Sequence, residues 1–265
     1  MVAVRKSVIV SHSAGRSVPT MSLDHLALMA DDVEKFARAL EIGSADSQIA
    51  GCPGWTLPAL GIHLGVVQRW ARAAALTGAP PQPAAVADQP PDDLPGIAAW
   101  FREGAARLLV TLHELDPSQP TWHPFPVEPK IAGLWRRRQA QEASVHRWDA
   151  QLAIGLAPSI ETEFADDGVD EYWTVMLPRM LLRESLAPPA SVLGVRATDT
   201  GSSWVIDGAD GTVRLAAGGA APTGWVHGSA EALLLRLWGR PVPEGAIHTG
   251  GDERVVDSWL ALGGA

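Results

Sequence analysis

Three side chains that can bind a metal ion recur at helical spacing within one stretch of this sequence. Glu142, His146 and Asp149 stand at positions i, i+4 and i+7 of residues 134–155, a segment rich in helix formers that contains no proline. On a helix they lie along one edge, so a carboxylate and an imidazole one turn apart could reach a single ion. A salt-bridged or solvated helix edge explains the same pattern. This stretch alone therefore leaves both interpretations open.

A further candidate ligand, His63, belongs to a separate predicted helix. Residues 56–78 start at a threonine, carry Pro58 in the first turn and end at Gly78, which is typical of a helix. His63 and Trp70 lie beside the apolar stripe of this helix rather than opposite it. A histidine in that position is commonly a packed core residue, so His63 on its own does not indicate a ligand.

The two helices together indicate a more specific chemistry. If they face each other in a bundle, His63 could lie opposite Glu142 and His146. Two histidines and one glutamate with a vacant fourth position are typical of a catalytic zinc site, whereas structural zinc sites normally have four protein ligands. Asp149 could then orient a ligand imidazole or contact the substrate directly.

The elements that must position these residues form two groups along the chain. Helical periodicity predicts helices over residues 22–39, 56–78, 96–115, 134–155 and 164–186, the last one kinked or broken at Pro178. From residue 188 the pattern changes to short strand-like runs separated by Gly and Asp turns. We expect strands at 191–197, 203–207, 212–216, 224–227 and 246–249, with helices at 229–238 and 252–262.

This pattern predicts an α+β protein of two domains. Residues 22–187 would form a four-helix bundle and residues 188–265 a small α/β domain, after a loosely ordered tail at residues 1–21. Residues 79–95 hold six prolines and are expected to form an irregular surface loop.

Composition restricts the function further. The 265-residue chain has a net charge of −9 and one cysteine. The acidic balance argues against a nucleic-acid partner, and a single cysteine excludes an internal disulfide and fits a reducing cytoplasm. No stretch approaches the roughly 20 apolar residues of a membrane span, so we expect neither export nor a membrane partner.

Three motifs resemble one known family. CPGWTLPALGIHLGVVQRWA at residues 52–71 and RRQAQEASVHRWDAQLAIG at 137–155 resemble two signatures of the mycothiol-dependent maleylpyruvate isomerase family. HGSAEALLLRLWGR at residues 227–240 resembles a motif of its C-terminal domain, in the same order along the chain. The resemblance implies a DinB-like metal-binding bundle followed by an α/β domain related to sterol-carrier-type folds.

The same resemblance implies zinc at His63, Glu142 and His146, with mycothiol as the thiol cosubstrate. One departure is Gln141, because the family usually has histidine directly before the ligand glutamate. A zinc-activated thiolate would add to the double bond of a maleylpyruvate-type substrate, and its expulsion after rotation would leave the trans isomer.

An arginine should bind the substrate carboxylates, because its planar fork matches them bidentately. Arg138, one turn before Glu142, is the first candidate, although Arg136–Arg138 could equally be a solvated run. The resemblance also implies a catalytic arginine in the C-terminal domain, which Arg236 or Arg240 could supply. We expect Cys52 to pack the entry of the second helix, and we assign no role to the four remaining histidines considered: His113, His123, His227 and His248.

Alternative functions stay open at this stage. A mycothiol S-transferase acting on an electrophilic metabolite would use the same thiolate but keep it on the product. A non-catalytic small-molecule binding module, or an interaction protein that keeps only the scaffold, belongs to a different class. We expect a cytoplasmic protein, monomeric or weakly dimeric, whose partners are a small thiol and an electrophilic small molecule.

Overall fold

The computed structural model describes residues 23–82, 88–216 and 221–263, and these divide into two compact units. The helical unit comprises residues 23–123 and 129–160, and the sheet unit comprises residues 124–128 and 161–263. The expected tail at residues 1–21 lies outside the described residues. The division falls earlier in the chain than the boundary expected near residue 187, because the helices after residue 161 pack with the sheet.

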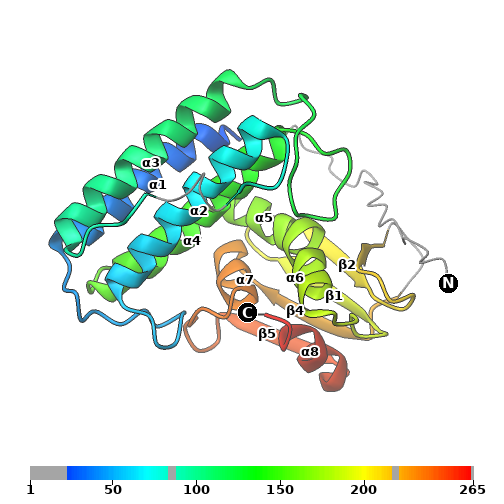
Figure 1. Ribbon diagram of the computed structural model, residues 1–265. Helices are drawn as coiled ribbons and strands as arrows, with labels where there is room; N and C mark the ends of the chain where they lie inside the picture. Colours follow the sequence, from blue (N-terminus) through cyan, green and yellow to red (C-terminus); the bar gives the residue numbers. More distant parts are fainter. Residues whose placement is uncertain (1–22, 83–87, 217–220, 264–265) are drawn as a thin grey trace. The chain divides into compact units, whose positions relative to one another are not determined.

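Four long helices form the helical unit (Figure 1). They are α1 (His25–Ile42), α2 (Leu57–Thr77), α3 (Leu94–Glu114) and α4 (Gly133–Ala153). Helix α1 packs against α3 and α4, and α2 packs against the same two helices. The four helices predicted from apolar periodicity are thus present, each within a few residues of its expected ends.

The interior of the bundle is apolar with a few charged exceptions. The rings of Phe36 on α1 and Phe101 on α3 meet at 4.8 Å between centroids. On α2, the side chains of Leu57, Leu60 and Leu64 are fully buried. One buried ion pair links α4 to α1, where Arg147 Nε donates to Asp32 Oδ1 at 2.8 Å. Burial raises the pKa of Asp32, and the Arg147 guanidinium opposes this rise.

A close approach between α2 and α3 depends on a glycine. A Cβ added to Gly65 would lie 2.1 Å from Cζ3 of Trp100, so the indole occupies the space that a side chain would fill. The guanidinium of Arg69 stacks 3.8 Å above the Trp100 ring and donates to the Trp100 carbonyl at 2.9 Å. This cation–π contact and the missing side chain at Gly65 together set the spacing of the two helices.

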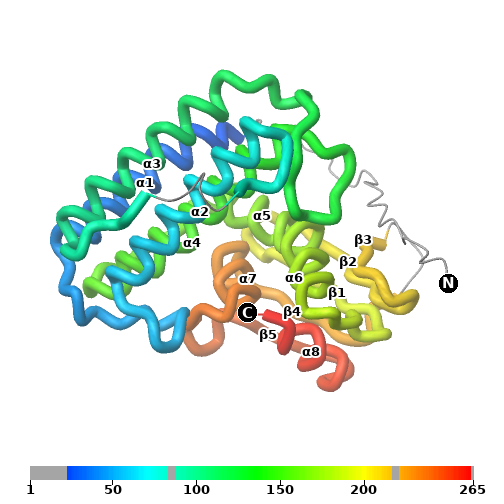
Figure 2. Tube along the Cα trace, viewed as in Figure 1, coloured from blue at the N-terminus to red at the C-terminus, as the bar shows by residue number. Residues whose placement is uncertain are grey.

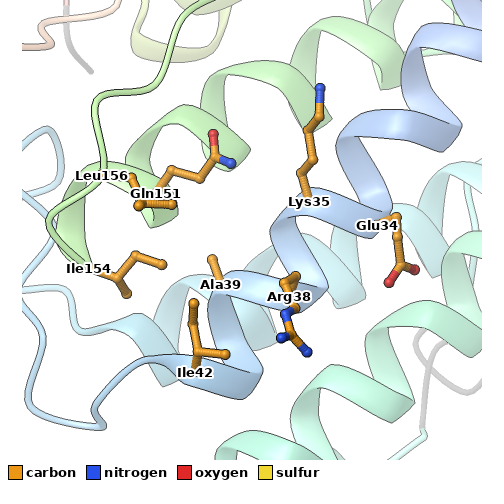
Figure 3. Close-up of a pocket in the computed structure, with 8 residues that line it drawn as sticks. All are labelled: Glu34, Lys35, Arg38, Ala39, Ile42, Gln151, Ile154 and Leu156. Carbon is orange, nitrogen blue, oxygen red and sulfur yellow. The ribbon is translucent and has the colours of Figure 1, made fainter.

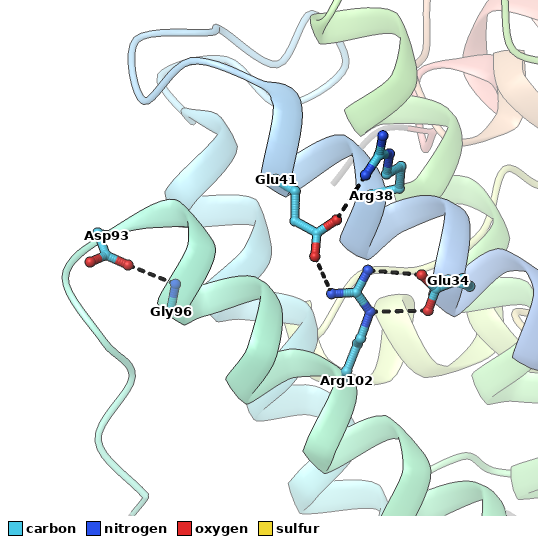
Figure 4. Close-up of polar contacts among 6 residues, drawn as sticks. All are labelled: Glu34, Arg38, Glu41, Asp93, Gly96 and Arg102. Carbon is cyan, nitrogen blue, oxygen red and sulfur yellow. Dashed lines mark hydrogen bonds and ion pairs between the residues drawn. The ribbon is translucent and has the colours of Figure 1, made fainter.

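The surface between α1 and α3 carries a small ion network (Figure 4). Arg102 donates to both carboxylate oxygens of Glu34, at 3.0 and 2.8 Å, and to Glu41 at 2.5 Å. Hydrogen bonds from Arg102 lower the pKa of both glutamates. At the start of α3, Gly96 N–H donates to the Asp93 carboxylate at 2.6 Å, which caps the helix.

The sheet unit begins with helices α5 (Thr162–Glu171) and α6 (Leu177–Glu184), joined by the π-helical segment η2 (Tyr172–Met176). We expected a kink or break at Pro178. The π-helical turn of η2 replaces the regular α-helical turn just before Pro178. Pro178 itself stands in the first turn of α6, where a missing N–H is tolerated.

A mixed sheet follows in the order β3-β2-β1-β4-β5 (Figure 2). Its strands are β1 (Val192–Ala197), β2 (Ser203–Asp207), β3 (Arg214–Leu215), β4 (Gly224–Gly228) and β5 (Ile247–Gly251). Strands β1 and β4 run parallel, and the other neighbours are antiparallel. Helix α7 (Ala230–Leu237) connects β4 to β5, and α8 (Glu253–Leu260) follows β5. The predicted α+β class is confirmed.

The two faces of the sheet differ in burial. Leu193, Val195, Ile206 and Val226 point to one face and are buried there. Helices α5 and α8 pack on this face: Trp204 donates from Nε1 to Asp170 of α5 at 3.2 Å, and a Cβ at Gly224 would meet Val256 of α8. The residues that alternate with these point to the opposite face, where Arg196 and Trp225 are exposed and Val192 and His227 are half-buried.

Among the described residues, no helix has the length and apolar character needed to cross a membrane.

Candidate metal centre

Helices α2 and α4 bring together the three residues predicted as ligands. His63 Nε2 lies 3.6 Å from Glu142 Oε1, and His146 Nε2 lies 3.4 Å from the same oxygen. One donor atom of each residue lies within 4.8 Å of the others. The His63 side chain is 36% exposed, whereas Glu142 and His146 are 17% and 11% exposed. The cluster is therefore open on the His63 side and enclosed on the α4 side.

The spacing of these donors fits a metal ion. Nitrogen and oxygen ligands lie about 2.0–2.1 Å from a tetrahedral zinc ion, which separates any two of them by about 3.4 Å. The distances from Glu142 to the two histidines are close to this value. The donor atoms of the two histidines lie within 4.8 Å of each other. The residues present fit a divalent metal with three protein ligands and room for another group.

Two charged neighbours on α4 hold these donors in place. Arg138 Nη2 donates to Glu142 Oε2 at 2.8 Å, which leaves Oε1 facing the histidines. Asp149 Oδ2 lies 3.1 Å from His146 Nδ1, so an Nδ1–H would donate to it and keep Nε2 directed at Glu142. Both Arg138 and Asp149 are buried, at 2% exposure each. These contacts repeat the i, i+4 and i, i+3 spacings of the helix.

Electrostatics favour the charged forms of the two residues from α4. Burial alone would raise the pKa of Glu142, but hydrogen bonds from His146 and His63 and the charge of Arg138 bring it well below its usual range. Burial alone would lower the pKa of His146, but Asp149 and Glu142 raise it above its usual value. A metal ion would therefore have to displace the Nε2 proton of His146, because a ligand imidazole is neutral. Glu142 is thus an ionised carboxylate at neutral pH, as a metal ligand must be.

A fourth residue, Trp55, contacts the cluster and was not predicted as part of the site. The turn Cys52–Trp55 closes through Trp55 N–H donating to the Cys52 carbonyl at 3.0 Å, with Gly54 at φ +83°. It leads directly into α2 and places the Trp55 ring edge-on against His63, at 4.9 Å between centroids. Trp55 stands eight positions before His63 and precedes the first residue of α2, so its contact with the imidazole depends on the turn.

The other residues predicted for the site take separate places. We expected the Arg138 guanidinium to bind the substrate carboxylates. In the structure its Nη2 donates to Glu142 instead. Arg240 is buried in the sheet unit and donates to the Trp238 carbonyl at 2.7 Å, and Arg236 stands in the last turn of α7. Gln141 is buried, at 1% exposure.

A separate hollow of about 240 Å³ opens between α1 and the end of α4 (Figure 3). Its walls include the stems of Lys35 and Arg38 and the apolar side chains of Ile42, Ile154 and Leu156. None of the three donors lines it. This hollow is therefore distinct from the candidate metal centre.

Fold and site together define a class of protein: a helical bundle with a three-donor metal-type cluster between two helices, followed by a mixed-sheet unit. Residues 26–151 match the family described as the mycothiol maleylpyruvate isomerase N-terminal domain. This match confirms the predicted resemblance over the helical part of the chain.

Solved structures agree with this assignment at the level of the fold. A crystal structure of the mycothiol-dependent maleylpyruvate isomerase is similar at a TM-score of 0.56, and that of a histidine-to-alanine mutant of the enzyme at 0.59. Each is 12% identical in sequence, and each alignment covers 86% of this chain and 92% of the other. Among curated proteins, no significant sequence match is found.

Proposed function

We propose that this chain is a zinc-dependent enzyme that uses a small thiol, mycothiol, to attack an electrophilic substrate, as in the cis–trans isomerisation of maleylpyruvate. The single observation that carries the proposal is the convergence of His63, Glu142 and His146 from two helices, with one side of the cluster open. A structural zinc site would instead be closed by four protein ligands. The family match over residues 26–151 supports the choice of mycothiol.

The chain's own residues would prepare this site before any substrate binds. Arg138 orients Glu142 by holding Oε2, and Asp149 orients His146 by holding Nδ1. Trp55 packs edge-on against His63 and restricts rotation of the most exposed ligand. The chemistry that zinc supplies when bound is to lower the pKa of a thiol at the open position.

The reaction on a maleylpyruvate-type substrate needs no protein nucleophile. The thiolate sulfur forms a bond to one carbon of the activated double bond, and the electron pair moves to the conjugated carbonyl oxygen. The former double bond is now single and can rotate. Return of the electron pair breaks the carbon–sulfur bond, releases the thiolate and leaves the trans isomer. Atoms and charge balance without net consumption of thiol.

The substrate carboxylates require a cationic partner, for which Arg236 and Arg240 of the sheet unit are the proposed candidates. Arg236 is the better one, because it is half-buried, whereas Arg240 is 8% exposed and already donates to the Trp238 carbonyl. We also reassign Arg138: its hydrogen bond to Glu142 supports a positioning role instead of substrate binding. The expected partners remain a small thiol and a small electrophile, with the protein acting in the cytoplasm as a monomer or weak homodimer.

Metal content tests the proposal first. We expect about one zinc per chain in the purified protein and none in the triple variant His63→Ala, Glu142→Ala, His146→Ala. The matched control is His113→Ala, because His113 is an exposed histidine of α3 outside the cluster. If the parent stays free of metal after zinc supplementation, the thiol-activation mechanism fails.

Following the thiol separates the remaining functions. Incubation with mycothiol and maleylpyruvate should change the substrate while free thiol stays constant if the protein is an isomerase. Loss of one thiol per product would identify the alternative, a mycothiol S-transferase. If the metal-loaded protein turns over neither thiol nor substrate, the non-catalytic binding module becomes the better description.

A further inference from the structure

The exposed face of the sheet carries a compact group of aromatic and cationic side chains. The strand register places Gly194 of β1, Trp225 of β4 and Gly250 of β5 side by side, and we call these three residues the tryptophan row. A second row lies two residues along the strands from the first. It consists of Arg196 of β1, His227 of β4 and His248 of β5, which we call the cationic row. All six belong to the sheet unit and lie outside the matched family domain.

Trp225 forms a platform on this face. A Cβ added to Gly194 would lie within 2.2 to 2.9 Å of three atoms of the indole, so the ring lies across the bare backbone of β1. Gly194 is buried beneath it, while Trp225 itself is 45% exposed. On the other side, a Cβ at Gly250 would meet nothing within 4 Å. The exposed indole therefore stands beside open space that a planar group could occupy.

The neighbouring row supplies positive charge. Arg196 is exposed and forms no ion pair with any of the described residues. The rings of His227 and His248 stack at 5.3 Å between centroids with 22° between their planes, and His248 is exposed. On the same face, Asp207 of β2 pairs with Val192, two register positions away from the tryptophan row, and its carboxylate accepts from the Ala209 N–H at 2.8 Å. An unpaired arginine beside two imidazoles contrasts with the net charge of −9 of the whole chain.

These features complement one kind of ligand. Residues two positions apart on a strand are separated by about 7 Å, which is the scale of an aromatic acid from ring to carboxylate. An aromatic ring would stack on Trp225 and fill the space over Gly250. Its carboxylate would accept hydrogen bonds from Arg196 and from an imidazole N–H of the cationic row.

We propose that this face of the sheet is a binding site for small aromatic carboxylates, formed by Trp225, Arg196 and the His227–His248 pair. The site is separate from the His63–Glu142–His146 cluster, and the proposal does not depend on the zinc chemistry.

The test uses the full chain and 2-naphthoate as the probe, followed through the tryptophan indole N–H resonances in ¹⁵N-labelled protein. The Trp225 signal is assigned by its loss in Trp225→Phe, and the Trp55 signal by its loss in Trp55→Phe. We expect 2-naphthoate to shift the Trp225 signal saturably. The variant Arg196→Gln and the uncharged probe 2-naphthamide should each weaken binding by about tenfold, the value of one charge-assisted hydrogen bond.

The control variant is Arg214→Gln, an exposed arginine of β3 that pairs with Asp210 and should leave the affinity unchanged. In the absence of probe, unchanged indole spectra of the two arginine variants, and the loss of a single signal in each tryptophan variant, verify that the variants are folded. Equal binding by Arg196→Gln and parent, equal binding of the amide, or no saturable shift at Trp225 would overturn the proposal. A shift confined to Trp55 would place the probe at the His63 cluster and overturn it as well.

Discussion

At the scale of single residues, the candidate metal centre depends on how its ligands are oriented. Glu142 and His146 each have one atom directed at the cluster and one atom held by a charged neighbour on the same helix. Such outer contacts fix the rotamer and tautomer of a ligand before the metal binds. Because the donors are already oriented in the folded protein, the metal does not have to order them when it binds, and its affinity is higher.

We therefore expect Asp149→Asn to weaken zinc binding by about 10- to 100-fold, because an amide holds the His146 Nδ1–H less strongly than a carboxylate does. Competition with a chromogenic chelator at fixed pH measures the dissociation constant directly. Asp31→Asn, an exposed aspartate of α1 paired with Lys35, is the matched control and should not change it. Equal zinc affinity of Asp149→Asn and the parent would remove Asp149 from the site.

At the scale of elements, the packing of α2 on α3 depends on the absence of a side chain at Gly65. Gly65→Ala places a Cβ 2.1 Å from the rigid Trp100 ring, so the helices must separate or the indole must leave its rotamer. We expect a loss of about 1–3 kcal/mol in the free energy of unfolding. Denaturant titration measures it, with the exposed neighbour Val66→Ala as a control that should change little.

The sign of the change in the free energy of unfolding distinguishes steric crowding from helix propensity at this position. Alanine is a better helix former than glycine by about 1 kcal/mol, so propensity alone would make Gly65→Ala stabilising. A stabilised variant would show that the α2–α3 contact yields without cost.

The ion network between α1 and α3 should make bundle stability depend on pH. Hydrogen bonds from Arg102 lower the pKa of Glu34 and Glu41 in the folded protein, so the network stabilises the fold above the unfolded pKa of about 4.5. This contribution is lost as the pH falls through the lower, folded-state values. The Tm difference between parent and Arg102→Gln should therefore be small and positive at pH 7 and shrink below about pH 4.5.

High salt should also reduce that difference, because the carboxylates are exposed and screened. Arg107→Gln breaks a pair within α3 and gives the matched control for losing one exposed arginine. A difference that grows as the pH falls would contradict the assignment of Glu34 and Glu41 as ionised partners.

At the scale of the whole molecule, local sequence patterns predicted the elements and left some tertiary partners undetermined. Apolar periodicity placed α1 to α4, and short strand-like runs between Gly and Asp turns placed the strands, since both patterns are local to a single element. The packing of α5 against α7 and of η2 against β3 involves contacts distant in sequence, so composition alone suggested a boundary near residue 187 instead of residue 160.

The same distinction applies within the site. Spacing on one helix revealed Glu142, His146 and Asp149, and the proximity of His63 required the bundle and the family resemblance together. The i, i+4 pair of Arg138 and Glu142 was visible in the sequence, yet an arginine near a site for carboxylates has two possible partners, and only coordinates identify the one it contacts. The contact of Trp55 with His63 depends on the turn that precedes α2.

The division into two units leads to a prediction about where zinc acts. The three donors all belong to α2 and α4, so an ion would tie these two helices together and stabilise the helical unit selectively. Zinc at about 100 times its dissociation constant adds about 2.7 kcal/mol to any unfolding that breaks the site. Hydrogen exchange of α2 and α4 peptides that proceeds through such unfolding should slow by about 100-fold, while exchange of β1 and β4 peptides should change little.

The triple variant of His63, Glu142 and His146 should show no zinc effect. Equal slowing in both units would instead mean that they unfold as one cooperative structure.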